Sequence, residues 1–373
     1  MLTILFFVSI ALYAIILLFF TLGLFKRDRN HSKDQPFVTV VIPVKNEKDH
    51  ISRILTEVTR QTYPKAYYEV VVVDDESTDI TPNVCHAFVE KHSNVRFMST
   101  KGSSSTLRTK KRPLDMGIRQ AKGEIILLTD ADCHVSSSWI ETMISYFTPQ
   151  VGLVIGYAQT EPTETNLHKI QALDFLLLMG AARGTTQWGL PFACTGQNLA
   201  YRKEAFEKVG GFSSFADTVG GDDNLLLQRI KHFTPWKIVF ATHSFSYVSS
   251  PPVPTLKGFI TQRIRWATDA LFIRKYDPLF FSMTVTTFLV NLLPLIMLGS
   301  SLWSPGLLNP LIIGLIVKFA IEGILMLRTT VVFNRSDLRV TFPYWFILQI
   351  PYVTIMGVFS FVGNRMPWGG RQT

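Results

Sequence analysis

Cysteine is scarce in this sequence. Cys85, Cys133 and Cys194 are the only three among 373 residues, they lie far apart, and none belongs to a Cys-x-x-Cys pair. An odd, scattered set of this kind excludes a disulfide framework and offers no cysteine-based zinc site. We therefore expect three reduced, buried thiols.

Signatures of nucleic-acid binding are also missing. The formal net charge is +9, but the Lys and Arg residues are dispersed, and no zinc-finger, basic-zipper or RNA-stacking pattern accompanies them. We expect no nucleic-acid partner. Part of the charge instead follows an apolar segment, at Lys26, Arg27, Arg29 and Lys33, as it does at the cytoplasmic edge of a membrane.

Charged residues are absent from Leu2 to Phe25. This run exceeds the ~20 residues that span hydrocarbon, and it has neither a basic start nor a small-residue cleavage site. We expect a transmembrane helix over residues 1–26 rather than a signal peptide. The basic residues after it predict a cytoplasmic domain in an integral protein of the inner or plasma membrane.

Two more uncharged stretches lie in the last hundred residues, one between Asp277 and Lys318 and one from Val340 to Asn364. They predict apolar segments near 279–301, 307–327 and 341–362, in a membrane region at 278–364 that precedes a tail at 365–373. Four full spans would place both termini outside. Because the tail is basic, we interpret the last segment as interfacial or re-entrant.

Lys318 and Glu322 are charges inside the middle segment. They lie four residues apart and share a helix face, so they are expected to pair and so lower the cost of burying an isolated charge. A contact with a lipid headgroup is the alternative.

Residues 36–255 show a different pattern, in which short β-branched runs alternate with helical periodicity. We expect strands at Val38–Val44, Tyr68–Val73, Val95–Met98 and Glu124–Thr129, with a helix from Ile51 to Val58 between the first two. This alternation predicts an α/β domain with a mostly parallel sheet and helices on its faces.

Acidic residues follow two of these strands. Asp74 and Asp75 come directly after one, and Asp130 and Asp132 come after another, at the sheet edge where α/β proteins bind ligands. A carboxylate at the first position can accept a hydrogen bond from a base or a ribose. The second pair suits Mg²⁺ or Mn²⁺. The alternative for the first pair is a helix cap formed with Ser77, Thr78 and Asp79. The alternative for the second pair is a solvated turn.

Asp222 and Asp223 precede an apolar run that begins at Leu225. Asp223 is placed to take a proton from an attacking hydroxyl, whereas the alternative is that Asp222 caps a helix with Asp223 in its first turn.

Residues 256–277 mix aromatic, aliphatic and basic side chains. This mixture, which includes Arg263 and Arg265, is typical of an amphipathic helix in the headgroup layer. Such a helix is either a simple membrane anchor or a surface where Trp266 stacks on a sugar or acceptor while the cations face phosphates.

Taken together, these motifs resemble the membrane-bound members of inverting glycosyltransferase family 2, which include ceramide glucosyltransferases and polysaccharide synthases. The resemblance covers Phe37 to Ala270. It is carried by Val41-Ile42-Pro43-Val44-Lys45-Asn46-Glu47, Asp74-Asp75, Asp130-Ala131-Asp132, Gly196-Gln197-Asn198, Gly210-Gly211-Phe212, Asp223 and Gln262-Arg263-Ile264-Arg265-Trp266. Asp222 and Asp115 differ from the Glu and Asn that are usual in the family.

The resemblance implies a GT-A fold with membrane helices, and it implies a role for each matched residue. Asp223 would be the catalytic base, and Asp130 and Asp132 would hold Mn²⁺ or Mg²⁺. Donor contacts would come from Pro43, Glu47, Asp74, Asp75, Lys110, Asp130, Gln262, Arg265 and Trp266. Acceptor contacts would come from Gly196, Gln197, Asp222 and Trp266.

The function implied is inverting, metal-dependent transfer of a sugar from a nucleotide diphosphate donor, expected to be a UDP-sugar, to a lipid-linked or membrane-delivered acceptor. A processive polysaccharide synthase is the first alternative, although the chain has few apolar segments from which to form a polymer channel. An inactive nucleotide-sugar-binding scaffold is the second, but no expected carboxylate is missing.

Overall fold

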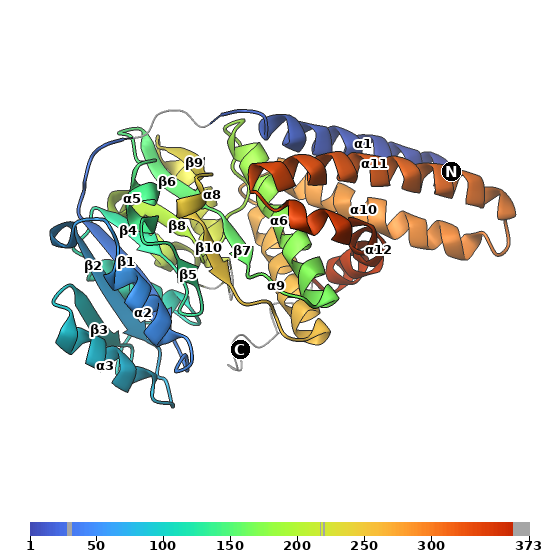
Figure 1. Cartoon of the computed structure of the whole chain (residues 1–373). Helices are drawn as coiled ribbons and strands as arrows, with labels where there is room; N and C mark the ends of the chain where they lie inside the picture. The colour runs from blue at the N-terminus through green and yellow to red at the C-terminus, as the bar shows by residue number, and fades with distance from the viewer. Residues whose placement is uncertain (28–31, 217, 219–220, 361–373) are drawn as a thin grey trace. The chain divides into compact units, whose positions relative to one another are not determined.

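The computed structural model describes residues 1–27, 32–216, 218 and 221–360. The predicted tail at 365–373 and the end of the last predicted segment lie outside this range. The chain forms two compact units, one of Met1–Arg27, Pro162–Phe192 and Pro252–Thr373, and one of Asp28–Glu161 and Ala193–Pro251 (Figure 1). We call them the helical unit and the α/β unit.

The α/β unit contains a seven-stranded sheet in the order β3-β2-β1-β4-β8-β6-β9. Its strands are β1 (Val38–Val44), β2 (Tyr68–Asp74), β3 (Val95–Ser99), β4 (Ile125–Leu128), β6 (Val151–Gly156), β8 (Leu199–Arg202) and β9 (Lys237–Ala241). The four predicted strands are β1 to β4, which pair in parallel. The sheet is not parallel throughout, because β8 is antiparallel to both of its neighbours.

Helices and a small second sheet complete this unit. The helices are α2 (Ile51–Thr59), α3 (Thr81–Lys91), α4 (Lys111–Arg119), α5 (Trp139–Ile144), α7 (Lys203–Lys208) and α8 (Asp222–Phe233), and the 3₁₀ turns are η1 (Lys65–Tyr67), η2 (Gly211–Phe215) and η3 (Ser244–Ser246). The second sheet, in the order β5-β10-β7, consists of β5 (His134–Val135), β7 (Ala158–Thr160) and β10 (Val248–Ser250).

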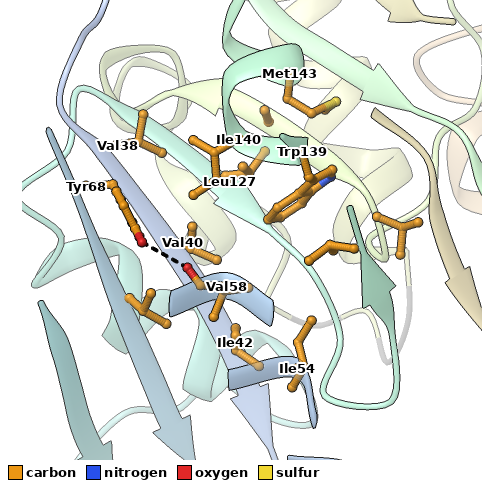
Figure 2. Close-up of a cluster of buried hydrophobic side chains, with 14 of the residues drawn as sticks. Val38, Val40, Ile42, Ile54, Val58, Tyr68, Leu127, Trp139, Ile140 and Met143 are labelled. Atoms are coloured by element: carbon orange, nitrogen blue, oxygen red, sulfur yellow. Dashed lines mark hydrogen bonds between the residues drawn. The ribbon is translucent and has the colours of Figure 1, made fainter. Parts of the chain in front are cut away.

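The side chains of β1 point alternately to the two faces of the large sheet, and a helix covers each face. Val38, Val40 and Ile42 face a buried core that includes Ile54 and Val58 of α2 (Figure 2). On the opposite face Val41 lies against α4, so closely that a Cβ on Gly117 would be 2.7 Å from Val41 Cγ1. The expected α/β fold, with helices on both faces of the sheet, is confirmed.

The helical unit contains α1 (Leu2–Gly23), α6 (Asn166–Thr186), α9 (Leu256–Ile273), α10 (Pro278–Ser300), α11 (Leu308–Val332) and α12 (Phe342–Phe359), with 3₁₀ turns η4 (Pro305–Leu307) and η5 (Ser336–Thr341). Among the residues that the structure describes, four stretches are long and apolar enough to cross a membrane: Leu2–Gly23, Pro278–Ser300, Pro305–Val332 and Ser336–Phe359. They correspond to the four predicted apolar segments. Figure 1 shows α1 alongside α11, against which it packs.

A buried polar cluster joins three of these helices. Lys318 Nζ lies 2.7 Å from Glu322 Oε1, which confirms the predicted pair. Tyr13 of α1 donates to the same oxygen at 2.8 Å, and Gln349 of α12 donates to Glu322 Oε2 at 2.6 Å. Because both charged side chains are buried, the contacts favour the structural ion pair over a headgroup contact.

Helices α1 and α6 approach each other at a pair of glycines. A Cβ on Gly23 would lie 2.1 Å from the carbonyl oxygen of Gly184, and one on Gly184 would lie 2.4 Å from that of Phe20. Since the atoms that would be met are backbone, no side-chain rotation relieves the overlap. The crossing therefore requires small residues on both helices.

Gly184→Ala is expected to lower the free energy of unfolding of the helical unit by about 1–3 kcal/mol, because the two helices must move apart. Gly299→Ala is the matched control, since a Cβ on this α10 glycine meets no atom within 4 Å. Thermal unfolding in detergent, followed by circular dichroism, compares the two. Equal midpoints would show that the crossing is not tightly packed.

Candidate active site

The acidic residues singled out from the sequence gather at one edge of the large sheet. Asp74 is the last residue of β2 and pairs with Val44 at the end of β1, and β4 is the other neighbour of β1. Because the three strands are parallel, Asp74 at the end of β2, Asp75 after it, and Asp130 and Asp132 after β4 all lie at the carboxyl ends on this edge. The placement expected for a ligand-binding edge is therefore present.

Asp75 is held by contacts within the protein. Its Oδ1 accepts from Arg112 Nη2 at 2.6 Å, from Arg112 Nε at 2.9 Å and from Thr100 Oγ1 at 2.9 Å. The carboxylate is 1% exposed. Sequence reasoning missed Arg112, whose only signal is its place in the basic run after Thr109. These contacts give Asp75 a supporting role beside the edge.

Asp74 has a different environment. Its Oδ2 accepts from the backbone N–H of Ser77 at 3.2 Å, whereas its buried Oδ1 has no hydrogen-bond partner among the residues that the structure describes. A buried carboxylate oxygen without a donor is costly in the free protein, and a ligand N–H or O–H would remove that cost.

An open cleft of about 650 Å³ adjoins Asp74. It is lined by Asp74, Glu76, Ser77, Thr78, Pro82, Phe97, Ser99 and Lys101. Phe97 and Ser99 come from β3, and sequence reasoning did not single them out. The cleft thus adds an aromatic face and a lysine to the carboxylate at the end of β2.

The residues after Asp75, for which a helix cap was the alternative interpretation, serve as a cap only in part. Asp79 Oδ1 accepts from the N–H of Thr81 at 2.9 Å, where α3 begins, so this side chain does serve the helix. Ser77 and Thr78 instead bond to Asn46, whose amide oxygen accepts from the N–H of Thr78 at 2.8 Å. The segment after β2 is therefore fastened to the loop after β1.

Asp130 and Asp132 lie among charges of both signs. Lys110 Nζ pairs with Asp130 Oδ1. Burial, followed by the charge of Asp130, raises the pKa of Asp132. Burial, followed by the charges of Asp132 and Asp130, raises the pKa of Glu47 to about 7. In the free site these carboxyl groups repel one another when they ionise, so they bind protons more tightly than isolated carboxyl groups do. This is expected of carboxylates that bind a cation.

The donor set fits a hard divalent ion that is shared with a ligand. Within the described ranges, no three His, Cys, Asp or Glu side chains are arranged around a metal position. Asp130 and Asp132 would supply carboxylate oxygens, and phosphate oxygens and water would supply the remainder, which is the coordination that Mg²⁺ and Mn²⁺ commonly accept.

Asp223 lies in the first turn of α8 beside Asp222, after Gly221, which takes φ +70° as the residue before the helix. Asp222 is therefore not the cap that the alternative interpretation required. Asp223 Oδ2 accepts from the N–H of Gly196 at 2.8 Å. Burial, followed by the charge of Asp222, raises the pKa of Asp223 to about 6.

Lys110 connects the two acidic sites. Burial alone would lower the pKa of this lysine, but the charges of Asp130, Asp222 and Asp223 outweigh burial and raise it. A Cβ on Gly196 would lie 3.5 Å from Lys110 Nζ and 3.7 Å from Asp223 Oδ2. The pair after β4 and the pair at the start of α8 therefore belong to one electrostatic site.

The two residues after Gly196 differ in burial, since Gln197 is half-buried and Asn198 is buried. Gln197 Nε2 donates to Ser250 Oγ at 3.0 Å. Asn198 is fully buried, donates to the carbonyls of Tyr157 and Ser246, and accepts from Trp139 Nε1 at 3.1 Å. Asn198 is thus part of the core. Asp115, one of the two departures from the family pattern, pairs with Arg119 on its own helix at 2.6 Å.

The Gln262 to Trp266 segment lies on α9 in the helical unit. The interpretation of Arg263 as a basic residue facing headgroups is wrong, because this side chain is buried and its Nε lies 2.7 Å from Asp174 Oδ2 on α6. An ion pair between residues 89 apart has no signal in a local pattern. The donor contacts of Gln262, Arg265 and Trp266 stay a prediction.

Known proteins give a consistent picture. The glycosyltransferase AglE of Haloferax volcanii is 38% identical over 113 residues, which are 30% of this chain and 35% of that protein. A beta-monoglucosyldiacylglycerol synthase of Nostoc sp. is 25% identical over 321 residues, which are 80% of this chain and 67% of that protein. The chain thus matches only part of the length of these curated relatives.

A solved structure supports the fold. The mannosyltransferase PcManGT from Pyrobaculum calidifontis, determined in complex with GDP-Man and Mn²⁺, covers 97% of both chains with a TM-score of 0.61 and 21% identity. At this identity the likeness bears on the fold alone, which is the expected GT-A fold.

The sequence profile that matches is that of glycosyl transferase family 21, over residues 1–373. The sequence motifs had pointed to glycosyltransferases through family 2, and the match specifies a different family number within the same enzyme class. Since the profile covers the whole sequence, the chain belongs to glycosyl transferase family 21.

Proposed function

We propose that this glycosyltransferase moves a sugar from a nucleotide diphosphate donor to a hydroxyl group of a membrane-delivered acceptor, with inversion at the anomeric carbon. The observation that carries the proposal is the single electrostatic site in which Lys110 links Asp130 with Asp222 and Asp223. A diphosphate leaving group needs positive charge, and an acceptor hydroxyl needs a base, so the site has a place for both.

The nucleoside would bind in the cleft at the ends of β2 and β3. Asp74 Oδ1 would accept from a base N–H or a ribose hydroxyl, which would give this oxygen its missing donor. Phe97 offers a ring for stacking, and Lys101 a charge for phosphate. Asp75 would act through its bonds to Arg112 and Thr100, while Pro43 and Glu47 border the donor from β1 and its loop.

The diphosphate would lie beside Asp130 and Asp132, which would hold Mn²⁺ or Mg²⁺. When bound, the divalent ion would neutralise charge on the leaving diphosphate. Lys110, which pairs with Asp130, would also offer its ammonium to the phosphate oxygens. Gln262 and Arg265 would contact the pyrophosphate from α9.

Asp223 would be the general base. As the acceptor oxygen bonds to the anomeric carbon, its proton passes to the Asp223 carboxylate and the bond from that carbon to the phosphate oxygen breaks. A carboxylate whose pKa is about 6 is ionised at pH 7, yet it is more basic than an ordinary aspartate. The N–H of Gly196 fixes its orientation, and Gln197, Asp222 and Trp266 would border the acceptor.

The acceptor would arrive from the bilayer. Four helices are long and apolar enough to span it, and one relative is named as a synthase of a glucosyl-diacylglycerol. We place the catalytic domain, expected at residues 36–255 and now without the Pro162–Phe192 segment that belongs to the helical unit, in the cytoplasm. The helix at 256–277 would lie in the headgroup layer. Incubating the purified protein with UDP-, GDP- and dTDP-sugars, Mn²⁺ and host lipid extract, followed by mass spectrometry, identifies the product. A ladder of long polymers would favour a processive synthase instead.

Asp223→Asn is expected to reduce kcat by at least about 10²–10⁴-fold, because the amide cannot accept the acceptor proton. Donor affinity should stay within about twofold of the parent protein, as measured by titration calorimetry. Glu204→Gln, which changes an exposed carboxylate in the same unit, is the control. Normal turnover by the Asp223 variant would remove this residue from the role of base.

The acid limb of the pH profile should follow Asp223. Because the base works when deprotonated and its pKa is about 6, kcat/KM should fall about tenfold per pH unit well below 6. Asp222→Asn removes the neighbouring negative charge that contributes to the raised pKa, so the limb should move to lower pH in this variant. A limb that does not move would argue against this coupling.

Removing divalent metal should stop transfer, and Asp132→Ala should not recover with excess Mn²⁺. The same variant should lose Mn²⁺ binding detected by electron paramagnetic resonance, which is independent of turnover. Glu204→Gln again serves as the control, since this carboxylate is exposed on α7. Full activity in a chelator would contradict the metal assignment.

A further inference from the structure

One side of α2 carries polar side chains that recur every four residues. Arg53 and Glu57 lie on the helix, and Gln61 continues the spacing two residues beyond its end. Residues four apart share one side of a helix. Another side of α2 is buried in the core of the α/β unit, and it consists of Ile51, Ile54, Leu55 and Val58. Because this burial fixes the rotation of α2, its polar side chains project in set directions.

Arg53 and Glu57 bond to the chain that follows β4. Arg53 Nη2 donates to the carbonyl oxygen of Asp132 at 3.1 Å. Glu57 Oε2 accepts from the N–H of Val135 at 2.9 Å, and Glu57 Oε1 lies 2.8 Å from His134 Nδ1. Helix α2 is therefore hydrogen-bonded to Asp132 itself and to β5, which begins two residues later.

Gln61 extends these contacts along the chain. Its Nε2 donates to the carbonyl oxygen of Ser136 at 2.7 Å, and its Oε1 accepts from the N–H of Ile140 at 3.0 Å. Side chains spaced four residues apart thus bond, in order, to successive parts of the segment from Asp132 to Ile140. This segment follows the path that α2 gives it.

The turn that contains Asp132 is fixed on its inner side as well. The N–H of Cys133 donates to the carbonyl oxygen of Asp130 at 3.2 Å, which closes the turn. The Cys133 side chain is buried in the core. Asp132 therefore lies between a buried neighbour and a carbonyl group that Arg53 holds.

Glu161, directly after β7, contacts the same network. Its Oε1 lies 3.1 Å from His134 Nε2 and 3.7 Å from Arg53 Nη2. His134 is thus placed between Glu57 and Glu161, with a carboxylate oxygen near each ring nitrogen. Because each member of the network limits the rotation of the next, the hold on Asp132 does not depend on a single bond.

This hold bears on cation binding because of the charges in the site. Asp130 and Asp132 repel each other when both are ionised, and the repulsion favours turning one carboxylate away from the other. A divalent ion instead needs both carboxylates turned toward one position. Since Arg53 bonds to the carbonyl oxygen of Asp132, this bond does not compete with a metal for the carboxylate oxygens.

We propose that Arg53 and Glu57 are positioning residues that hold the main chain at Asp132 and so prearrange its carboxylate for a divalent cation. The inference rests on the proposed function, because it takes Asp132 as a metal ligand. All the residues involved belong to the α/β unit. Arg53 and Glu57 act through the main chain and do not themselves touch the cation.

Arg53→Met and Glu57→Leu test this role, since each removes the polar group but retains most of the aliphatic side chain. Each should raise the Kd for Mn²⁺ about tenfold or more in the purified full chain, as measured by electron paramagnetic resonance. For Arg53 the sign is informative, because loss of a nearby positive charge would by itself strengthen cation binding. The Mn²⁺ concentration that gives half-maximal transfer should rise in parallel, with kcat at saturating Mn²⁺ within about threefold of the parent.

Two further variants serve as controls. Glu57→Gln offers an oxygen to the N–H of Val135 and an NH₂ group to His134 Nδ1, so its Mn²⁺ affinity should stay within about threefold of the parent. Arg60→Met makes the same substitution at an exposed arginine at the end of α2 and should leave the affinity unchanged.

The outcomes separate the positioning role from the proposed function. If Asp132→Ala weakens Mn²⁺ binding but Arg53→Met and Glu57→Leu only lower the unfolding temperature, the positioning role is overturned and the metal assignment stands. Equal weakening by Glu57→Gln and Glu57→Leu also overturns it, because the Gln variant keeps the bonds. Arg53→Met and Glu57→Leu decide separately, so if one does not fold the other still gives the test. A parent protein that binds Mn²⁺ no better than Asp132→Ala overturns the metal assignment, and this inference falls with it.

Discussion

The repulsion between carboxylates at the edge of the large sheet is the interaction on which the site depends. Asp130, Asp132, Asp222 and Asp223 come from two segments almost a hundred residues apart, and Lys110 is the cation that faces both. Without it, burying these charges together would be strongly unfavourable. The fold tolerates the acidic site because one lysine at the start of α4 is shared by its two halves.

The helical unit handles buried charge in another way. Two of its buried carboxylates, Asp174 and Glu322, each collect a cation and two neutral donors. In an apolar surrounding these donors have few other partners, so the bonds fix which faces of the helices meet.

The sequence was sufficient to predict what local patterns determine. The β-branched runs located β1 to β4 to within a residue or two, and the four-residue spacing of Lys318 and Glu322 identified their ion pair. It could not reveal β8 between β4 and β6, because antiparallel insertion depends on long-range pairing. The same limit hid the partner of Arg263 and the fork of Arg112 on Asp75, since nothing in a single sequence joins residues so far apart.

The polar clusters of the helical unit have a consequence for biosynthesis. Tyr13 is made near the start of translation, but its partner Glu322 and the further donor Gln349 are made near the end. Asp174 is likewise made well before its donors Trp345 and Tyr352. The α/β unit has all its strands once residue 250 has emerged. During synthesis the first helix therefore forms before its Tyr13 hydroxyl has a partner, and a ribosome that stalls before α12 leaves the carboxylates of Asp174 and Glu322 short of donors.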